Sequence, residues 1–339
     1  MDIHVIWFVL LGVLLAGYAI LDGFDLGVGI LHPLAPEDQD RRLFLNSIGP
    51  IWDGNEVWLV VFGGALLAAF PEAYATVFSG YYLALMLVLW ALIFRAVSIE
   101  FRSKQKSPGW RRFWDFSFFG SSTVASLVFG IAVGNSMVGI PLDARGNYLG
   151  SFLDLLRPYP ILAGLVVVAM NAMHGAMYLF LKLPEGHTRN IVRGWMWHTW
   201  GWFLVLYMLG TMYTVVAIKR SVANFEQFPW AVAIVVLNVL AIANIPRSVY
   251  ANKPIMAFAS STVNIMCLVA LFGVAHWPNM VYASNDPTRS LTIYNAASSE
   301  GTLWIMLVIA MIGLPFVLTY TATVYWTFRG RVELGEHSY

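Results

Sequence analysis

Nine long apolar runs constrain this chain more than any other feature of its sequence. A helix needs about 20 predominantly apolar residues to cross roughly 30 Å of hydrocarbon. The runs are continuous rather than alternating, which favours helices, because in lipid each backbone polar group must be paired within its own segment or in a closed barrel. The predicted spans are 3–32, 51–70, 73–95, 116–138, 158–182, 194–218, 229–246, 254–276 and 301–328.

The composition agrees with a membrane protein. Of the 339 residues, 59% are hydrophobic and only 12% are charged, which is far too apolar for a soluble domain of this length. The net charge of +1 provides no basic field that would attract nucleic acid, so none is expected as a partner. We therefore predict an all-α integral membrane protein with about nine transmembrane helices, in which residues 1–339 form a single transmembrane domain.

Lysine and arginine are unevenly divided between the two sides of these spans. Cationic loops are retained on the cytoplasmic side of a membrane. If the N-terminus lies outside, 15 of the 20 Lys and Arg residues fall in inner regions, and the remaining five are Arg145, Arg157, Lys219, Arg220 and Arg289. This bias predicts an N-terminus outside and a cytoplasmic C-terminus, in agreement with an odd number of spans.

A weak internal repeat suggests how the spans are grouped. Gly12 precedes Asp22–Gly23 in the first span at the same spacing at which Gly164 precedes His174–Gly175 in the fifth. Because glycine is common in membrane helices, chance explains this similarity about equally well. The repeat favours two four-helix bundles, roughly 1–140 and roughly 155–276, with a peripheral ninth helix at roughly 301–328.

Acidic residues are concentrated where the first two spans meet the inner side. Asp22 and Asp25 are three residues apart and share a helix face. A carboxylate at this depth costs about 2–3 kcal/mol on insertion scales, and such groups often serve ion or proton movement. Asp53 and Glu56 open the next span, so we expect all four acids to lie together. For this second pair, ordinary helix-start chemistry is the alternative, because acids in a first turn complement the helix dipole.

Two glycines lie beside the first pair of acids. Gly23 and Gly27 are four residues apart, a spacing that lets a neighbouring helix backbone approach closely. We therefore predict that this face of the first span packs against another helix.

A third group of charges lies at the next inner loop and comprises Glu100, Lys104 and Asp115. Charges beside a membrane are ordinary, so a purely interfacial role is the first interpretation. The alternative is a hydrated opening that passes protons inward to the buried acids.

Histidine is a side chain that could ligate haem or a metal in this chain. Only His174 and His198 lie within spans on the inner side, and a bis-histidine haem between them is geometrically conceivable. A neutral, hydrogen-bonded core histidine is the favoured interpretation of His174, because no second histidine pair or Cys motif accompanies it. No metal site is expected in this chain.

Several motifs together resemble subunit II of the cytochrome bd family of quinol oxidases. They occur in the expected order across nearly the whole chain: LDGFDLGVG, NSIGP with WDGNEVW, FRSK with a following WD, GNSMVGIP, HGAMYL and LTIYNAASS. The most specific is DGFDLGVG followed about thirty residues later by WDGN.

The resemblance implies a subunit of a respiratory enzyme that oxidises quinol and reduces oxygen to water. It places haem b, haem d, the oxygen site and the quinol-oxidising loop in a partner, subunit I. This chain would then carry no cofactor and no catalytic residue of its own. The location implied is the cytoplasmic membrane of a bacterium or archaeon, and the resemblance leaves room for a bound quinone or lipid and for a small accessory single-helix subunit.

The resemblance also implies a proton path from the cytoplasm through subunit II to the oxygen-reducing haem. The acidic positions of the family match Asp25 and Asp53 best, while some relatives carry Gln at the place of Glu56. Further contributors implied are Asp22, Glu100, Lys104 and Asp115. The alternatives are a purely structural assembly subunit of the same complex and a stand-alone proton-coupled transporter.

Overall fold

The computed structural model describes residues 2–335, and most of them lie in helices. The twelve α-helices of this range are α1 (Ile3–Leu31), α2 (Asp38–Ile48), α3 (Trp52–Ala69), α4 (Pro71–Gly80), α5 (Tyr82–Phe101), α6 (Pro108–Val138), α7 (Pro158–Lys182), α8 (His187–Ala217), α9 (Lys219–Gln227), α10 (Val232–Tyr250), α11 (Pro254–His276) and α12 (Glu300–Thr327). Short 3-10 turns are η1 (His32–Leu34), η2 (Arg102–Lys104), η3 (Leu153–Leu155), η4 (Pro229–Ala231) and η5 (Pro287–Arg289). Two strands, β1 (Asn279–Val281) and β2 (Leu291–Thr292), pair antiparallel.

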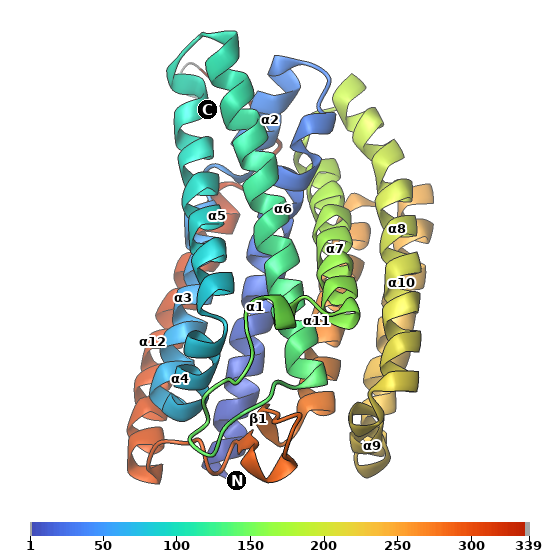
Figure 1. The fold of residues 1–339 in the computed structure, drawn as a ribbon. Coiled ribbons are helices and arrows are strands. Elements are labelled where there is room, and N and C mark those ends of the chain that lie inside the picture. Colours follow the sequence, from blue (N-terminus) through green and yellow to red (C-terminus); the bar gives the residue numbers. More distant parts are fainter. Residues whose placement is uncertain (1, 336–339) are drawn as a thin grey trace.

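The long helices run side by side, and α1 lies among them (Figure 1). One end of the molecule carries α2 and the other carries β1 and the N-terminus; we call them the α2 end and the β1 end. α1, α3, α5 and α6 pack on one another, as do α7, α8, α10 and α11, while α12 touches mainly α1 and α3. These contacts divide the helices into two groups of four with α12 outside them, and the groups meet where α7 packs against α1 and α6.

Eight helices of the described range are long and apolar enough to cross a membrane. They are α1, α5, α6, α7, α8, α10, α11 and α12. The remaining predicted span, 51–70, coincides with α3, an 18-residue helix whose first turn carries polar side chains. The membrane-helical fold is thus confirmed, and the count of nine stays a prediction.

The predicted span 73–95 is wrong at both ends. The chain forms the short helix α4 up to Gly80, breaks at Tyr81 and begins α5 at Tyr82. Pro71 at the start of α4 ends the preceding helix, because proline cannot continue the hydrogen-bond ladder of α3. α5 then continues past Arg95 to Phe101, since Arg95 is paired with acids inside the protein and does not mark the membrane surface.

Two short helices were not predicted because neither is an apolar run. α2 lies between α1 and α3, and α9 lies between α8 and α10. α2 exposes Asp38 and buries Phe44 and Ile48, and α9 exposes Lys219 and buries Ser221. Such amphipathic helices are typical of membrane interfaces.

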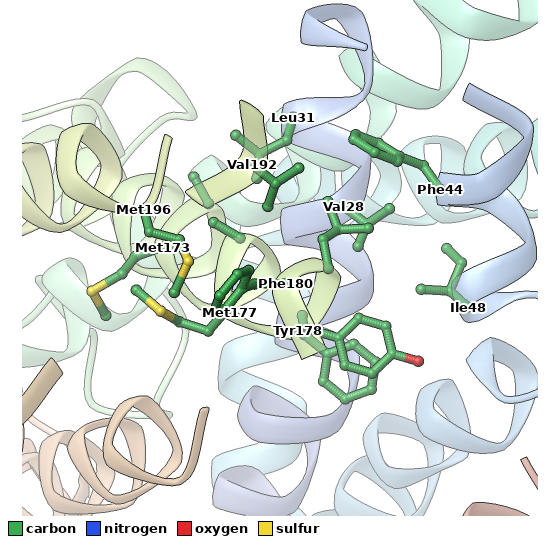
Figure 2. Close-up of a cluster of buried hydrophobic side chains, with 14 of the residues drawn as sticks. Val28, Leu31, Phe44, Ile48, Met173, Met177, Tyr178, Phe180, Val192 and Met196 are labelled. Carbon is green, nitrogen blue, oxygen red and sulfur yellow. The ribbon is translucent and has the colours of Figure 1, made fainter. Parts of the chain in front are cut away.

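The largest hydrophobic core lies towards the α2 end, where α1, α2, α7 and α8 meet. Figure 2 shows side chains from all four helices converging there: Val28, Leu31, Phe44, Ile48, Met173, Met177, Tyr178, Phe180, Val192 and Met196. The Tyr178 ring stacks on Phe24 of α1 with 4.0 Å between ring centroids, and its hydroxyl donates to the Ser47 carbonyl of α2 at 2.6 Å. This core holds the last turns of α1 rigidly against α7.

The closest approach between α1 and α7 is made by glycines. A Cβ atom on Gly27 would lie 1.9 Å from the Asn171 carbonyl oxygen, and one on Gly175 would lie 2.4 Å from the Gly27 carbonyl carbon. A Cβ on Gly23 would lie 3.2 Å from Oδ1 of Asn171. Both glycines singled out in the sequence therefore face α7, which brings the acids between and beside them into the protein interior.

Candidate functional site

A buried ion cluster joins three helices near the α2 end. Asp22 of α1 is fully buried and accepts a hydrogen bond from Nη1 of Arg95 of α5 at 2.6 Å. Nη2 of the same guanidinium lies 3.2 Å from Oε2 of Glu56 of α3, whose side chain is 21% exposed. One buried cation therefore faces two carboxylates, so the cluster carries a net negative charge when both acids are ionised.

Asp25 lies one helical turn beyond Asp22 and has different surroundings. It is fully buried, and its Oδ2 accepts a hydrogen bond from Nδ2 of Asn55 at 2.8 Å. The Asn55 side-chain oxygen in turn accepts from the Tyr325 hydroxyl of α12 at 2.8 Å. No cation contacts Asp25 within the described residues, and its Oδ1 has no hydrogen-bond partner among them.

The structure corrects the expectation that four acids lie together. Asp22, Asp25 and Glu56 belong to one region, whereas the Asp53 side chain is exposed on the surface of the chain. The reason is helix geometry: Asp53 and Asn55 are two positions apart, and each residue turns about 100° around the helix axis, so their side chains point about 200° apart. With Asn55 turned towards Asp25, Asp53 points away from Asp25 to the exposed side of α3. Its charge still acts on Glu56 from there.

Asp115 lies in a second ion cluster, closer to the α2 end. Its Oδ1 is 2.5 Å from Nε of Arg102 and 2.6 Å from Nε2 of His32, and its Oδ2 is 3.1 Å from Nη1 of Arg41. Arg102 also donates to Asp38 at 2.7 Å. These contacts tie the start of α6 to the ends of α1 and α5 and to α2.

The two remaining charges of the predicted opening lie at the same end. Glu100 is half-buried in the last turn of α5, and Lys104 is exposed in η2. Both are thus at the surface or close to it, while Asp115 is held by three neighbours.

His174 and His198 are not arranged to hold a haem between them. His174 is fully buried, and its two ring nitrogens are bonded to the Ser261 hydroxyl at 2.7 Å and the Ile20 carbonyl at 3.1 Å. Its ring also stacks on Phe258 with 4.8 Å between centroids. His198 is exposed and bonds the Gly194 carbonyl of its own helix at 3.1 Å. Because both nitrogens of His174 are used, neither is free to ligate iron.

Sequence reasoning missed Arg95, Asn55 and Tyr325 as members of the site. Arg95 was counted only as a cation of the inner side, although a lone arginine amid apolar residues is itself a sign of a buried partner. Asn55 lies in the WDGN motif between Asp53 and Glu56, and a single amide there does not indicate a partner. Nothing local marks Tyr325, because its contact with Asn55 spans 270 residues of sequence.

Chemically, the arrangement suits proton transfer better than ligand binding. It places two buried carboxylates one turn apart, one of them neutralised by a guanidinium and the other bonded only to a neutral amide. An unpaired carboxylate charge is costly in an apolar interior, so Asp25 is well placed to hold a proton.

Comparison with known proteins assigns this architecture to a family. A family model described as cytochrome bd terminal oxidase subunit II matches residues 3–328. The cytochrome bd-I ubiquinol oxidase subunit 2 of Escherichia coli (strain K12) is 36% identical, over 96% of this chain and 94% of that protein. The cytochrome bd ubiquinol oxidase subunit 2 of Bacillus subtilis (strain 168) is 33% identical, over 99% and 98%.

A solved structure has the same fold. A chain of the bd oxidase from Geobacillus thermodenitrificans superposes with a TM-score of 0.80 at 18% sequence identity, covering 97% of this chain and 99% of that one. The match of the family model, the near-complete coverage of the relatives and the shared fold agree with the motifs found in the sequence. The chain therefore belongs to the cytochrome bd terminal oxidase subunit II family.

Proposed function

We propose that this chain, as subunit II of a bd-type quinol oxidase, conducts protons from the cytoplasm towards the oxygen-reducing haem of subunit I. Membership of the family makes it a multi-pass membrane subunit of an oxidoreductase complex that contains haems and a partner subunit. Reduction of oxygen to water consumes protons, and a path through protein is needed to deliver them across the apolar interior. The observation that carries the proposal is Asp25, a fully buried carboxyl group bonded to a neutral amide and one turn from the paired Asp22.

In this proposal the residues have separate tasks. Asp25 accepts and releases the proton, while Arg95 offsets one of the two negative charges of Asp22 and Glu56, and the negative charge that remains favours a passing proton. Glu56, which is partly exposed, connects this interior to the surface. Asp53, Glu100 and Lys104 would collect protons at the α2 end, which the charge bias assigns to the cytoplasm.

The contacts of Asp115 favour a structural task instead. Both of its oxygens are engaged by arginines or histidine, and breaking such a buried ion pair is costly. We therefore assign Asp115 to holding the helix ends at the α2 end rather than to carrying protons.

Haems are proposed to lie in subunit I, and His174 in this chain is proposed to be a packing residue. The hydrogen bonds of its ring to Ser261 and Ile20 support this division. A complex with His174→Gln should retain both its haem spectrum and its haem content. Loss of a bis-histidine haem signal in this variant would overturn the assignment of the haems to subunit I.

Asp25→Asn in the assembled complex tests the proton path. The substitution keeps the shape of the side chain and removes its ability to release a proton, so quinol-dependent oxygen consumption should fall at least about tenfold, equivalent to about 1.4 kcal/mol in the barrier. Haem content should remain normal. The matched control is Glu226→Gln, an exposed carboxyl on α9 at the β1 end, which should leave turnover unchanged.

The same variants separate the alternatives. A purely structural subunit would show normal turnover in Asp25→Asn whenever the complex assembles. A stand-alone transporter would move protons without subunit I, whereas we expect proton uptake to require the complete oxidase and its quinol.

A further inference from the structure

We infer that Tyr325 of α12 is a positioning residue for proton transfer, acting through Asn55 on the carboxyl group of Asp25. This inference rests on the proposed proton path and adds to it a residue from the peripheral helix α12. It also assigns a task to α12 beyond crossing the membrane.

The two hydrogen bonds form a short chain in which each donor points towards Asp25. The Tyr325 hydroxyl donates to the side-chain oxygen of Asn55 at 2.8 Å, and the Asn55 amide nitrogen donates to Oδ2 of Asp25 at 2.8 Å. An asparagine amide has one oxygen and one NH2 group, so an oxygen held by Tyr325 turns the NH2 group towards Asp25. Asn55 is itself buried, with 1% of its surface exposed.

This orientation makes the two oxygens of Asp25 different. Oδ2 accepts from Asn55 and so is the acceptor oxygen of the pair, which leaves Oδ1 as the oxygen that can carry the transferred proton. Without the tyrosine hydroxyl, the Asn55 amide could rotate and present its oxygen to Asp25. The carboxyl group would then hydrogen-bond to Asn55 through its own proton and hold that proton back.

Tyr325 stands out on a helix that otherwise faces outward. Most large side chains of α12 are exposed, including Ile309, Phe316 and Trp326, and Leu303 is its one buried residue among those described. Tyr325 is half-buried and packs against the core beside α1 and α3. The polar contact with Asn55 is therefore a specific feature of this position.

Tyr325→Phe in the complete oxidase tests the inference, because it removes only the hydroxyl. Turnover should fall about fivefold, the effect of losing one hydrogen bond of about 1 kcal/mol. The infrared carbonyl-stretch band of protonated Asp25, identified by its loss in Asp25→Asn, should also shift in frequency. The matched control is Tyr320→Phe, on the same helix but 63% exposed, which should change neither quantity.

A double variant shows whether the two residues act in series. Asn55→Leu removes both hydrogen bonds, so adding Tyr325→Phe to it should cause no further loss of turnover. Additive losses would contradict a relay through Asn55.

The outcomes distinguish this inference from the proposal beneath it. A normal turnover in Asp25→Asn would overturn the proton path itself. If Asp25→Asn is slow but Tyr325→Phe has normal turnover and an unshifted Asp25 band, only the positioning role of Tyr325 is overturned.

Discussion

At the scale of single residues, Arg95 determines whether the buried acids can coexist. Its guanidinium lies between Asp22 and Glu56, and it is 1% exposed. Removing one partner of a buried ion pair typically costs 3–5 kcal/mol, because the remaining charge is left without compensation.

Arg95→Met should therefore lower the yield of assembled oxidase and its thermal stability, by about 3 kcal/mol or more. The double variant Arg95→Met with Asp22→Leu should recover much of the loss, since both buried charges are then absent. Thermal unfolding of the purified complexes measures the stability of the single and of the double variant. Equal stability of Arg95→Met and the unchanged oxidase would contradict the ion pairing.

The residues that the sequence could predict were those with an unusual environment along the chain. Asp22 and Asp25 stood out as carboxylates deep in an apolar helix, and both are buried. Asp53 was grouped with them by sequence proximity, but the turn of α3 carries it to the exposed side. Tyr325 could not be found from sequence, because its partner is set only by the packing of α12 on α3.

At the scale of helices, the contact between α1 and α7 places the acids in the interior. Gly27→Ala would drive a methyl group into the backbone of Asn171, which must then move. Overpacking of this kind typically costs about 1–3 kcal/mol. Gly12→Ala on the same helix is the matched control, because no atom beyond the neighbouring backbone of α1 lies within 4 Å of its added methyl group.

We expect the Gly27→Ala oxidase to unfold several degrees below the unchanged enzyme, and the Gly12→Ala oxidase to unfold within about a degree of it. Thermal unfolding followed by loss of the haem spectrum gives both values. Similar midpoints for the two variants would show that α1 and α7 are not held together at Gly27.

The segment after α12 is attached to the loop between α7 and α8. The Val332 amide donates to the Lys182 carbonyl at 2.9 Å, and the Lys182 ammonium donates to the carbonyls of Phe328 and Gly330. Glu185 lies 2.7 Å from Arg331 and 2.9 Å from Arg189. The hydrogen bond from Arg331, together with the charges of both arginines, holds the pKa of Glu185 below its usual value.

This attachment should weaken in acid. A carboxyl whose pKa is lowered by folding stabilises the folded form above its ordinary pKa, about 4.3, and this contribution is lost as the pH falls through the lowered value. Protection of the Val332 amide from hydrogen exchange, corrected for the intrinsic rate, should therefore decrease below about pH 4. In Glu185→Gln this pH dependence should be absent; the same decrease in the variant would rule out Glu185 as its cause.

Most helices could be predicted from sequence, but their ends and breaks could not. The apolar-run criterion stopped at Arg95, although pairing with Asp22 lets α5 continue to Phe101. It also joined α4 to α5, because no charged residue marks the break at Tyr81. α2 and α9 were not predicted by this criterion because only one side of each helix is apolar.

At the scale of the whole molecule, the fold class and the family followed from sequence because both depend on long patterns. The apolar runs fall on the long helices of the described chain, eight of which could cross a membrane, and the motifs extend over most of its length. What required the structure was the pairing of side chains from different helices: Asp22 with Arg95, and Asp25 with Asn55 and Tyr325. The N-terminus-outside orientation and the single-domain organisation stay predictions.

Much of the apolar surface of the chain faces outward, especially on α8, α10 and α12. In a membrane complex such a surface is covered by lipid or by a partner subunit. We expect part of it to contact subunit I, so that protons released by Asp25 can pass to that subunit without meeting bulk water.

Proton uptake by the oxidase reconstituted in lipid vesicles tests the central claim most directly. With the α2 end facing the vesicle lumen, addition of external quinol in the presence of oxygen should make the lumen alkaline in the unchanged enzyme. In Asp25→Asn the initial rate of this alkalinisation should fall at least about tenfold at equal haem content. Luminal alkalinisation at the unchanged rate in Asp25→Asn would contradict a proton path through this subunit.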